Sequence, residues 1–431
     1  MFKPVKDAFR SFEQRGGIYI FFSTILLRII QFVLGIMIIR LLSKEDYGNL
    51  SYAFSITQLI IPFSGAGLYL SLLHFGPIQK TPEDKLKLFA HTLRQGLIYS
   101  LLMLGAVLIL AGLLAVKMPG SLVYLRLFSF YIISYCLFYS FISLLRIKKQ
   151  NKAYAAALLG NSLLVFGLSL LGIFLGGGRG YAIGFVTAPA LTALIILLTL
   201  KGKEKESYGL FRRVEGLPVK SREYTKYGLY TGLGNIASQM AWQLDAIMIG
   251  IIMAQSTEVA VYKAASLIPF SLIFIPSVFM QTDFVYIAER FDQKKYLIAY
   301  YKKYLMVFTL ITAAVMAVWY AGGAQIVRIF GPEYIEARPL IDILMINVVS
   351  TFLLRVPLGN MLAAVGRAKW NSYSAVAMLG INVILNLLLI PRFGVRGAAF
   401  ATVTAISLSS LINLILFFVY LRQLDTKRPG A

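Results

Sequence analysis

The sequence contains very little of what most catalytic and metal-binding sites are built from. Among 431 residues there is one cysteine, Cys136, and there are two histidines, His74 and His91. A single cysteine excludes an intramolecular disulfide and a cysteine-based metal site, and two isolated histidines make no metal signature. The sequence also lacks a phosphate-binding loop, a nucleophile elbow and a long loop with clustered acids. We therefore expect neither an enzyme nor a bound metal or other cofactor.

Acidic residues are also scarce, whereas apolar residues are abundant. The chain has 19 Asp and Glu against 42 Lys and Arg, a formal net charge of +23, and is 58% hydrophobic. Its mean hydropathy is +0.74. Apolar runs long enough to cross a bilayer recur from end to end, which predicts an all-α polytopic membrane protein. The basic residues are scattered over short loops, and this pattern argues against a nucleic-acid partner.

Hydropathy windows of about 20 residues predict twelve transmembrane helices. They cover residues 18–41, 49–75, 93–116, 122–145, 154–175, 180–200, 229–253, 262–287, 299–322, 339–365, 372–391 and 397–421. Most Lys and Arg fall in alternate loops, so the positive-inside rule places these loops and both termini in the cytoplasm.

The longest polar segment lies almost at the centre of the chain. It predicts a cytoplasmic linker, 201–222, between an N-terminal six-helix lobe at 1–200 and a C-terminal six-helix lobe at 223–425. Within the first lobe, the segment 1–16 has apolar residues on one helical face and basic residues elsewhere. This pattern indicates either an amphipathic helix on the anionic inner leaflet or a disordered basic tail.

Two sequence echoes indicate that the lobes arose by duplication. Arg179–Ala188 and Arg396–Ala405 are identical at six of ten positions and lie 217 residues apart, and Ala157–Asn161 is similar to Ala377–Asn382. Two six-helix repeats of equal orientation are related by a pseudo-two-fold axis along the membrane normal, an arrangement used by alternating-access transporters. The interface between the halves is then the predicted route.

Arg28 lies near the middle of the first predicted span. Thr24, Arg28 and Gln31 follow i, i+4, i+7 spacing and share one helical face. An ionised side chain at the bilayer centre costs at least ~2.5 kcal/mol, so such residues usually face an internal cavity. Arginine binds phosphate oxygens bidentately, which indicates an anionic, phosphate-bearing substrate held by Arg28 and Gln31. The alternative is a buried structural pair with an acid such as Asp245.

The seventh predicted span has one broad polar side. It carries the candidate substrate-binding residues Asn235, Gln239 and Gln243, and a face this wide indicates a water-filled cavity. Asp245, in the outer half, could accept a coupling proton or help to bind sodium. Alternatively, it anchors a neighbouring helix end or neutralises Lys263.

Two further cations are candidates for the same cavity. Arg355 shares a helical side with polar residues of the tenth span, just before Pro357, which should disturb the helical hydrogen bonding. A long side chain at this depth could instead snorkel towards the cytoplasm. Lys263, near the outer end of the eighth span, is either a cavity cation or an interfacial anchor.

Several short motifs in order resemble a known family. They are Leu41–Leu50 (LLSKEDYGNL), Asp245 followed by Ser256–Tyr262 (STEVAVY), Ile329–Tyr334 (IFGPEY) and Gly394–Ala399 (GVRGAA). Together they resemble the polysaccharide transporters of the multidrug/oligosaccharidyl-lipid/polysaccharide exporter superfamily, the branch that contains O-antigen and related repeat-unit flippases.

This resemblance implies a V-shaped bundle of two six-helix lobes in a bacterial or archaeal cytoplasmic (inner) membrane. It implies export of an undecaprenyl-diphosphate-linked oligosaccharide, a cell-surface polysaccharide precursor, with bilayer lipids, H⁺ or Na⁺ and polysaccharide polymerase machinery as partners. In the related lipid II flippases, arginines of the first and eighth spans line a cationic cavity. Arg28 is similar to one of these, whereas Leu34 and Ser266 stand near the positions of the others.

Two other functions compete with this one. A cation-coupled multidrug exporter of the same superfamily would carry small organic cations, which a cavity richer in arginine than in acids repels. A membrane-embedded polysaccharide synthase or polymerase would need the aqueous catalytic loop that the sequence lacks.

Overall fold

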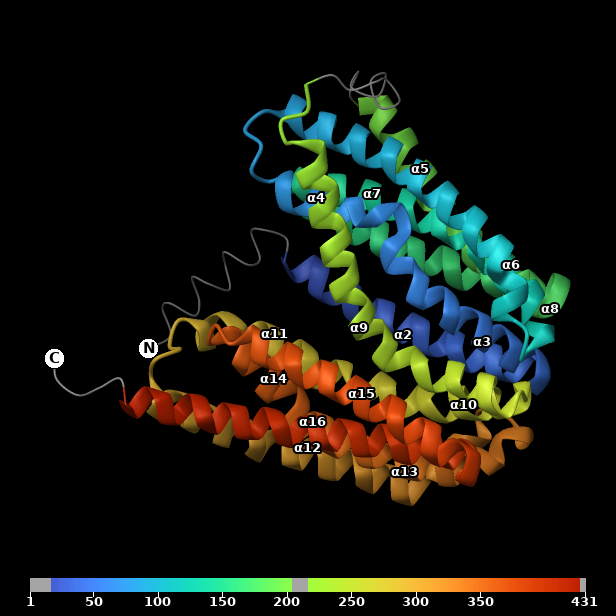
Figure 1. Cartoon of the computed structure of the whole chain (residues 1–431), viewed down its shortest axis with the longest axis vertical. Coiled ribbons are helices and arrows are strands. Elements are labelled where there is room, and N and C mark those ends of the chain that lie inside the picture. Colours follow the sequence, from blue (N-terminus) through green and yellow to red (C-terminus); the bar gives the residue numbers. More distant parts are fainter. Residues whose placement is uncertain (1–16, 204–215, 427–431) are drawn as a thin grey trace. The chain divides into compact units, whose positions relative to one another are not determined.

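The structure is a computed structural model. It describes the backbone of residues 17–203 and 216–426, and the side chains of 23–200, 216–233, 240, 242–284 and 286–425. These residues form helices joined by short turns (Figure 1), which confirms the predicted all-α class. By its internal contacts the chain divides into two compact units, Met1–Gln239 (unit 1) and Met240–Ala431 (unit 2).

Each unit is a bundle of helices. The helices of unit 1 are α2 (Gly17–Leu41), α3 (Lys44–Ile60), η1 (Ile61–Gly67), α4 (Leu68–Phe75), α5 (Pro82–Leu114), η2 (Pro119–Ser121), α6 (Leu122–Ser129), α7 (Tyr131–Ile147) and α8 (Asn151–Lys203). Helix α9 (Ser221–Met253) begins in unit 1 and ends in unit 2. Unit 2 continues with α10 (Ser256–Leu272), α11 (Phe274–Ala288), α12 (Lys294–Arg328), η4 (Pro332–Ala337), α13 (Arg338–Ser350), η5 (Thr351–Arg355), α14 (Val356–Ala364), α15 (Ala368–Phe393) and α16 (Val395–Thr426).

Within the described residues, ten helical segments are long and apolar enough to cross a membrane. One of them, Asn151–Leu200, contains both of the predicted spans 154–175 and 180–200. The predicted span 229–253 lies in α9, whose shorter apolar part is Trp242–Met253. The prediction of a polytopic helical membrane protein is therefore confirmed with ten candidate spans.

Helix α8 consists of two arms that fold back on each other. An added Cβ atom at Gly180 would lie 1.8 Å from the carbonyl oxygen of Gly172, and one at Gly184 would lie 2.3 Å from that of Leu168. These contacts pair residues in reverse order, so the arms are antiparallel. The turn passes through Gly177 at φ 59° and ψ −139°, a conformation that side chains strongly disfavour.

The same hairpin recurs in unit 2 between α15 and α16. Its turn passes through Gly394 at φ 58° and ψ −141°, and an added Cβ at Gly397 would lie 2.2 Å from the carbonyl oxygen of Leu389. Each of these residues lies 217 positions after its counterpart in unit 1, the offset of the sequence echo. Duplication of a hairpin predicts this result, because both copies keep the same turn angles and the same close backbone contacts.

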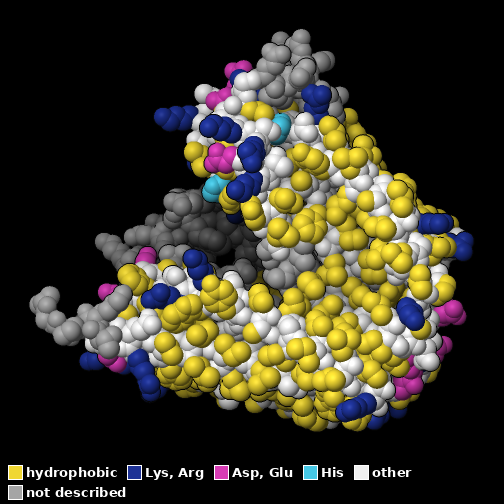
Figure 2. Space-filling model, in the orientation of Figure 1, with side chains coloured by type: hydrophobic (Ala, Val, Ile, Leu, Met, Phe, Trp, Pro, Cys, Tyr) yellow, Lys and Arg dark blue, Asp and Glu magenta, His cyan; other side chains and the backbone are white. Residues whose placement is uncertain are grey.

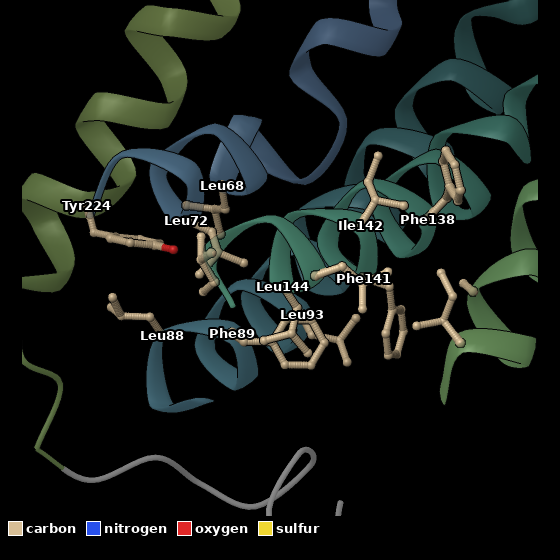
Figure 3. Packing of buried hydrophobic residues seen from close by; sticks show 14 residues of the cluster. Leu68, Leu72, Leu88, Phe89, Leu93, Phe138, Phe141, Ile142, Leu144 and Tyr224 are labelled. Carbon is tan, nitrogen blue, oxygen red and sulfur yellow. The ribbon is translucent and has the colours of Figure 1, made fainter. Parts of the chain in front are cut away.

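The start of α9 packs into the core of unit 1. Tyr224 points into the cluster of α4, α5 and α7 beside Leu72 (Figure 3), and its hydroxyl lies 2.6 Å from that of Thr92. The helix approaches the backbone of η1 closely, since an added Cβ at Gly67 would lie 2.3 Å from the carbonyl oxygen of Gly228. One continuous helix therefore belongs to the packing of unit 1 before it enters unit 2.

The surface agrees with a lipid environment. Figure 2 shows a broad area of hydrophobic side chains with Lys, Arg, Asp and Glu gathered at its margins. Ile109, Leu175 and Leu310 are 83%, 79% and 69% exposed. Large apolar side chains at this exposure suit acyl chains as a solvent.

Replacing Gly180 by alanine should destabilise the α8 hairpin. The added methyl would overlap the Gly172 carbonyl, and overpacking of this kind typically costs about 1–3 kcal/mol. The measurement is the unfolding temperature of the purified protein in detergent. Gly167→Ala is the matched control, because an added Cβ there meets nothing within 4 Å. Equal unfolding temperatures for the two variants would contradict the close crossing.

Candidate functional site

Arg28 lies on α2 with its side chain exposed. It makes no hydrogen bond or ion pair with any described residue, and it lies within electrostatic range of Tyr139 on α7. Gln31, one turn further along α2, is also exposed, whereas Leu34 is buried. In unit 1 the structure thus places a bare cation and an amide together near the middle of an apolar helix.

Asp245 lies in unit 2 and is 4% exposed. Its Oδ2 accepts hydrogen bonds from the hydroxyls of Tyr262 and Thr402, both at 2.5 Å. Its Oδ1 accepts from the amides of Asn382 at 3.1 Å and Asn386 at 2.7 Å. Four donors on α10, α15 and α16 therefore surround one carboxylate.

Oxygen atoms gather around this carboxylate. The Oδ1 of Asn382 accepts from Asn386 at 3.1 Å, and the buried Oδ1 of Asn386 has no hydrogen-bond partner among the described residues. The structure adds Tyr262, Asn382, Asn386 and Thr402 to the single acid that the sequence analysis selected. The signal in the sequence was the i, i+4 pair of asparagines in an apolar helix, which one helical face brings together.

Lys263 and Gln243 form a pair beside this cluster. The Nζ of Lys263 donates to the Oε1 of Gln243 at 2.7 Å. Lys263 lies within electrostatic range of Asp245, but no described salt bridge joins the two. Three predicted site residues are thus close together in unit 2.

Arg355 ends a π-helical turn, η5, just before Pro357. The disturbance of helical hydrogen bonding expected before Pro357 is therefore a π-helical turn. The freed carbonyls of Phe352 and Leu353 accept hydrogen bonds from two tyrosines of α12. The guanidinium of Arg355 is partly buried and donates to the Oδ1 of Asn371 at 3.0 Å.

Some predicted features lie outside the described residues. The side chains of Asn235 and Gln239 belong to this group, as do the segment 1–16 and residues 204–215 of the linker. Within the described part of the chain, no three His, Cys, Asp or Glu side chains gather in a way that could hold a metal ion.

The motif Leu41–Leu50 has structural contacts in unit 1. Ser43 caps α3 by accepting a hydrogen bond from the backbone N–H of Asp46 at 3.1 Å. The hydroxyl of Tyr124 on α6 donates to the Asp46 carboxylate at 2.6 Å. The motif therefore fixes the start of α3 against α6.

Comparison with known proteins gives both a family and a fold. The family described as "Polysaccharide biosynthesis protein" matches residues 14–279, more than half of the chain. The fold is similar to that of an inward-facing multidrug resistance MATE family transporter of the MOP superfamily, at 17% identity over 94% of this chain and 96% of that chain, with a TM-score of 0.78. It is also similar to the lipid II flippase MurJ in an inward closed conformation, at 16% identity over 95% of this chain and 90% of that chain, with a TM-score of 0.73.

One sequence relative is an uncharacterized membrane protein, MJ1068, of Methanocaldococcus jannaschii. It is 33% identical over 103 residues, which are 24% of this chain and 20% of that protein. The match thus spans about a fifth of the relative's length. The description of this relative as a membrane protein agrees with the candidate spans of this chain.

Replacing Asp245 by asparagine should destabilise unit 2. An amide keeps one acceptor oxygen and turns an N–H₂ group towards donors, and a buried donor without an acceptor costs about 1–3 kcal/mol. Thermal unfolding in detergent measures this loss. Asp425→Asn is the control, because that exposed carboxylate pairs with Lys294 on the surface, and such pairs contribute about 1 kcal/mol at most. Equal effects of the two changes would contradict the role of the four donors.

Proposed function

The chain belongs to the polysaccharide biosynthesis protein family and has the fold of MOP superfamily transporters, and from this premise we propose that it is a flippase. Its substrate is an undecaprenyl-diphosphate-linked oligosaccharide, which it moves from the inner to the outer leaflet of a bacterial or archaeal cytoplasmic membrane. Transport follows alternating access between two six-helix lobes, 1–200 and 223–425, joined by the linker 201–222.

Twelve crossings and cytoplasmic termini belong to this proposal. The two arms of α8 count as separate crossings, and α9 adds one to the segments described above. An even number of crossings leaves both termini on one side, and the excess of Lys and Arg in the loops of that side favours the cytoplasm. The duplication of the lobes is supported by the equal turns at Gly177 and Gly394.

Arg28 carries the proposal. A guanidinium in an apolar span with no acidic partner among the described residues is costly unless it faces water or an anion. A diphosphate supplies oxygens in the geometry that the planar guanidinium binds with two parallel hydrogen bonds. The same charge opposes small organic cations, so a multidrug exporter fits this site less well.

The remaining predicted residues contribute to the same transport route. Arg355 and Lys263 add positive charge along the route, and four amides supply hydrogen bonds to phosphate or sugar hydroxyls. The amide residues are Gln31, Asn235, Gln239 and Gln243. The lipid tail stays in the bilayer. Moving it into the protein would gain little free energy, because the bilayer core and the protein interior are both apolar.

Asp245 couples transport to an ion gradient in this proposal. A buried carboxylate among hydroxyl and amide oxygens offers the hard oxygen ligands that a sodium ion takes, and the free Oδ1 of Asn386 offers one more. Protonation of Asp245 would be the alternative way to neutralise it. Either event changes the charge inside unit 2, which is the condition for an ion to bias a conformational equilibrium.

Arg28→Ala should weaken binding of undecaprenyl diphosphate, and Arg28→Lys should retain part of the lost affinity, because the charge stays and the bidentate geometry is lost. Losing a charge-assisted pair of hydrogen bonds corresponds to about 1.5–3 kcal/mol, or roughly 10- to 150-fold in affinity. Binding to purified protein and surface polysaccharide in a deletion strain are the measurements. Arg126→Ala on α6 is the control. An Arg28→Ala protein that still produces surface polysaccharide at the normal level would refute the assignment.

The coupling ion can be identified by ligand-dependent stability. We expect sodium, compared with choline at constant ionic strength, to raise the unfolding temperature of the wild-type protein, since a ligand that binds only the folded state stabilises it. Asp245→Asn should remove this increase. A dependence on pH without any effect of sodium would identify a proton instead. Transport by Asp245→Asn at the wild-type rate under both gradients would contradict a coupling role.

A further inference from the structure

Three tyrosines of α7 form one face of that helix. Tyr131, Tyr135 and Tyr139 follow i, i+4, i+8 spacing, and each is only partly buried. They lie in the interior of the candidate span Pro119–Ile147 and not at its ends, so they do not belong to the interfacial belts in which membrane tyrosines concentrate. We call them the α7 tyrosine face.

The rings of this face are held in a fixed arrangement. Tyr135 and Tyr139 stack with ring centroids 4.0 Å apart at an interplanar angle of 27°. Tyr131 meets Tyr135 edge-on at 5.6 Å, and Phe185 of α8 supports Tyr131 at 5.0 Å. The hydroxyls of Tyr69 on α4 and Tyr135 lie 3.3 Å apart. Contacts from two neighbouring helices therefore fix the rings before any ligand binds, which lowers the entropic cost of binding.

One hydroxyl of this face, that of Tyr131, has no hydrogen-bond partner among the described residues. A phenol facing acyl chains at this depth would lose its hydrogen bonds to water without replacement. The face therefore suits a ligand that has both apolar surface and hydroxyl groups.

The position of Arg28 limits what that ligand can be. Its charge lies within electrostatic range of Tyr139, so it acts on a molecule that binds the tyrosines. An aromatic or aliphatic ammonium would be repelled at that place. A sugar attached to a diphosphate matches both features, since its C–H face packs on aromatic rings, its hydroxyls bond phenols, and its phosphates meet the guanidinium.

Resting on the flippase function above, we propose that the α7 tyrosine face is the subsite for the sugar directly attached to the diphosphate. Arg28 holds the diphosphate, and the exposed parts of the Tyr135 and Tyr139 rings pack against that sugar. The subsite thus distinguishes a glycosylated carrier lipid from the bare carrier lipid. This discrimination prevents the protein from returning or exporting the carrier without cargo.

The test compares two ligands on the same purified, full-length protein. One is undecaprenyl diphosphate bearing the oligosaccharide of the host strain, and the other is undecaprenyl diphosphate without sugar. For the wild type we expect tighter binding of the glycosylated lipid. In Tyr135→Leu/Tyr139→Leu this preference should fall by about tenfold, in line with a lost aromatic stacking partner, while affinity for the bare lipid changes less than about twofold. Tyr139→Phe, which keeps the ring, should retain most of the preference.

Tyr99→Leu on α5 is the matched control, since Tyr99 is a 37% exposed tyrosine of the same unit outside this face. It should preserve the preference. A folded double variant with an unchanged preference would overturn the proposal. Equal loss of both lipids would also overturn it, because the tyrosines would then support Arg28 and not the sugar. Binding of tetraphenylphosphonium to the wild type and not to the double variant would assign the face to an organic cation. A wild type that binds neither lipid would refute the flippase function itself.

Discussion

The cost of an ionised or polar group away from water governs this structure more than any other constraint. Unit 2 meets that cost internally, because Asp245 receives four hydrogen bonds from hydroxyls and amides on three other helices. Unit 1 leaves it unmet at Arg28, which has no bond to a described residue. A satisfied acid stabilises the helices around it, whereas a bare cation has to be accounted for by water or by a ligand.

The two hairpins show how a duplicated chain positions these groups. Gly177 and Gly394 adopt the same positive-φ turn, so each pair of arms can cross at backbone contact next to it. In unit 2 this crossing sets the register of α15 against α16, and Asn382 and Thr402 reach the same carboxylate as a consequence. At the offset of 217 residues, the positions of Asn382 and Thr402 are occupied in unit 1 by Val165 and Phe185. Duplication therefore accounts for the shared hairpin, and divergence accounts for the polar side chains that the hairpin of unit 2 carries.

The sequence predicts the helical class, the repeat and the individual acid, because each depends on local composition or on spacing along one helix. It does not predict the partners of Asp245, since they come from α10, α15 and α16 and meet only after packing. It also misses the α7 tyrosine face. Thirteen per cent of the chain is aromatic, so composition offers no way to separate three tyrosines in mid-span from those in the interfacial belts. The sequence also does not predict the partner of Lys263, which it leaves as either a cavity cation or an interfacial anchor, because its ammonium is bonded to Gln243 of the neighbouring helix.

The proposed function assigns the substrate and the coupling ion to different units of the chain. Ligands shift a conformational equilibrium only by their difference in affinity between the states, so substrate and ion need sites that respond to the same movement. In this chain the cation and aromatic rings are in unit 1, whereas the buried acid is in unit 2. Helix α9 belongs to both, since Tyr224 packs in the core of unit 1 and Asp245 lies five turns or more along the same helix. One helix therefore carries both a residue of the unit 1 core and the buried acid of unit 2.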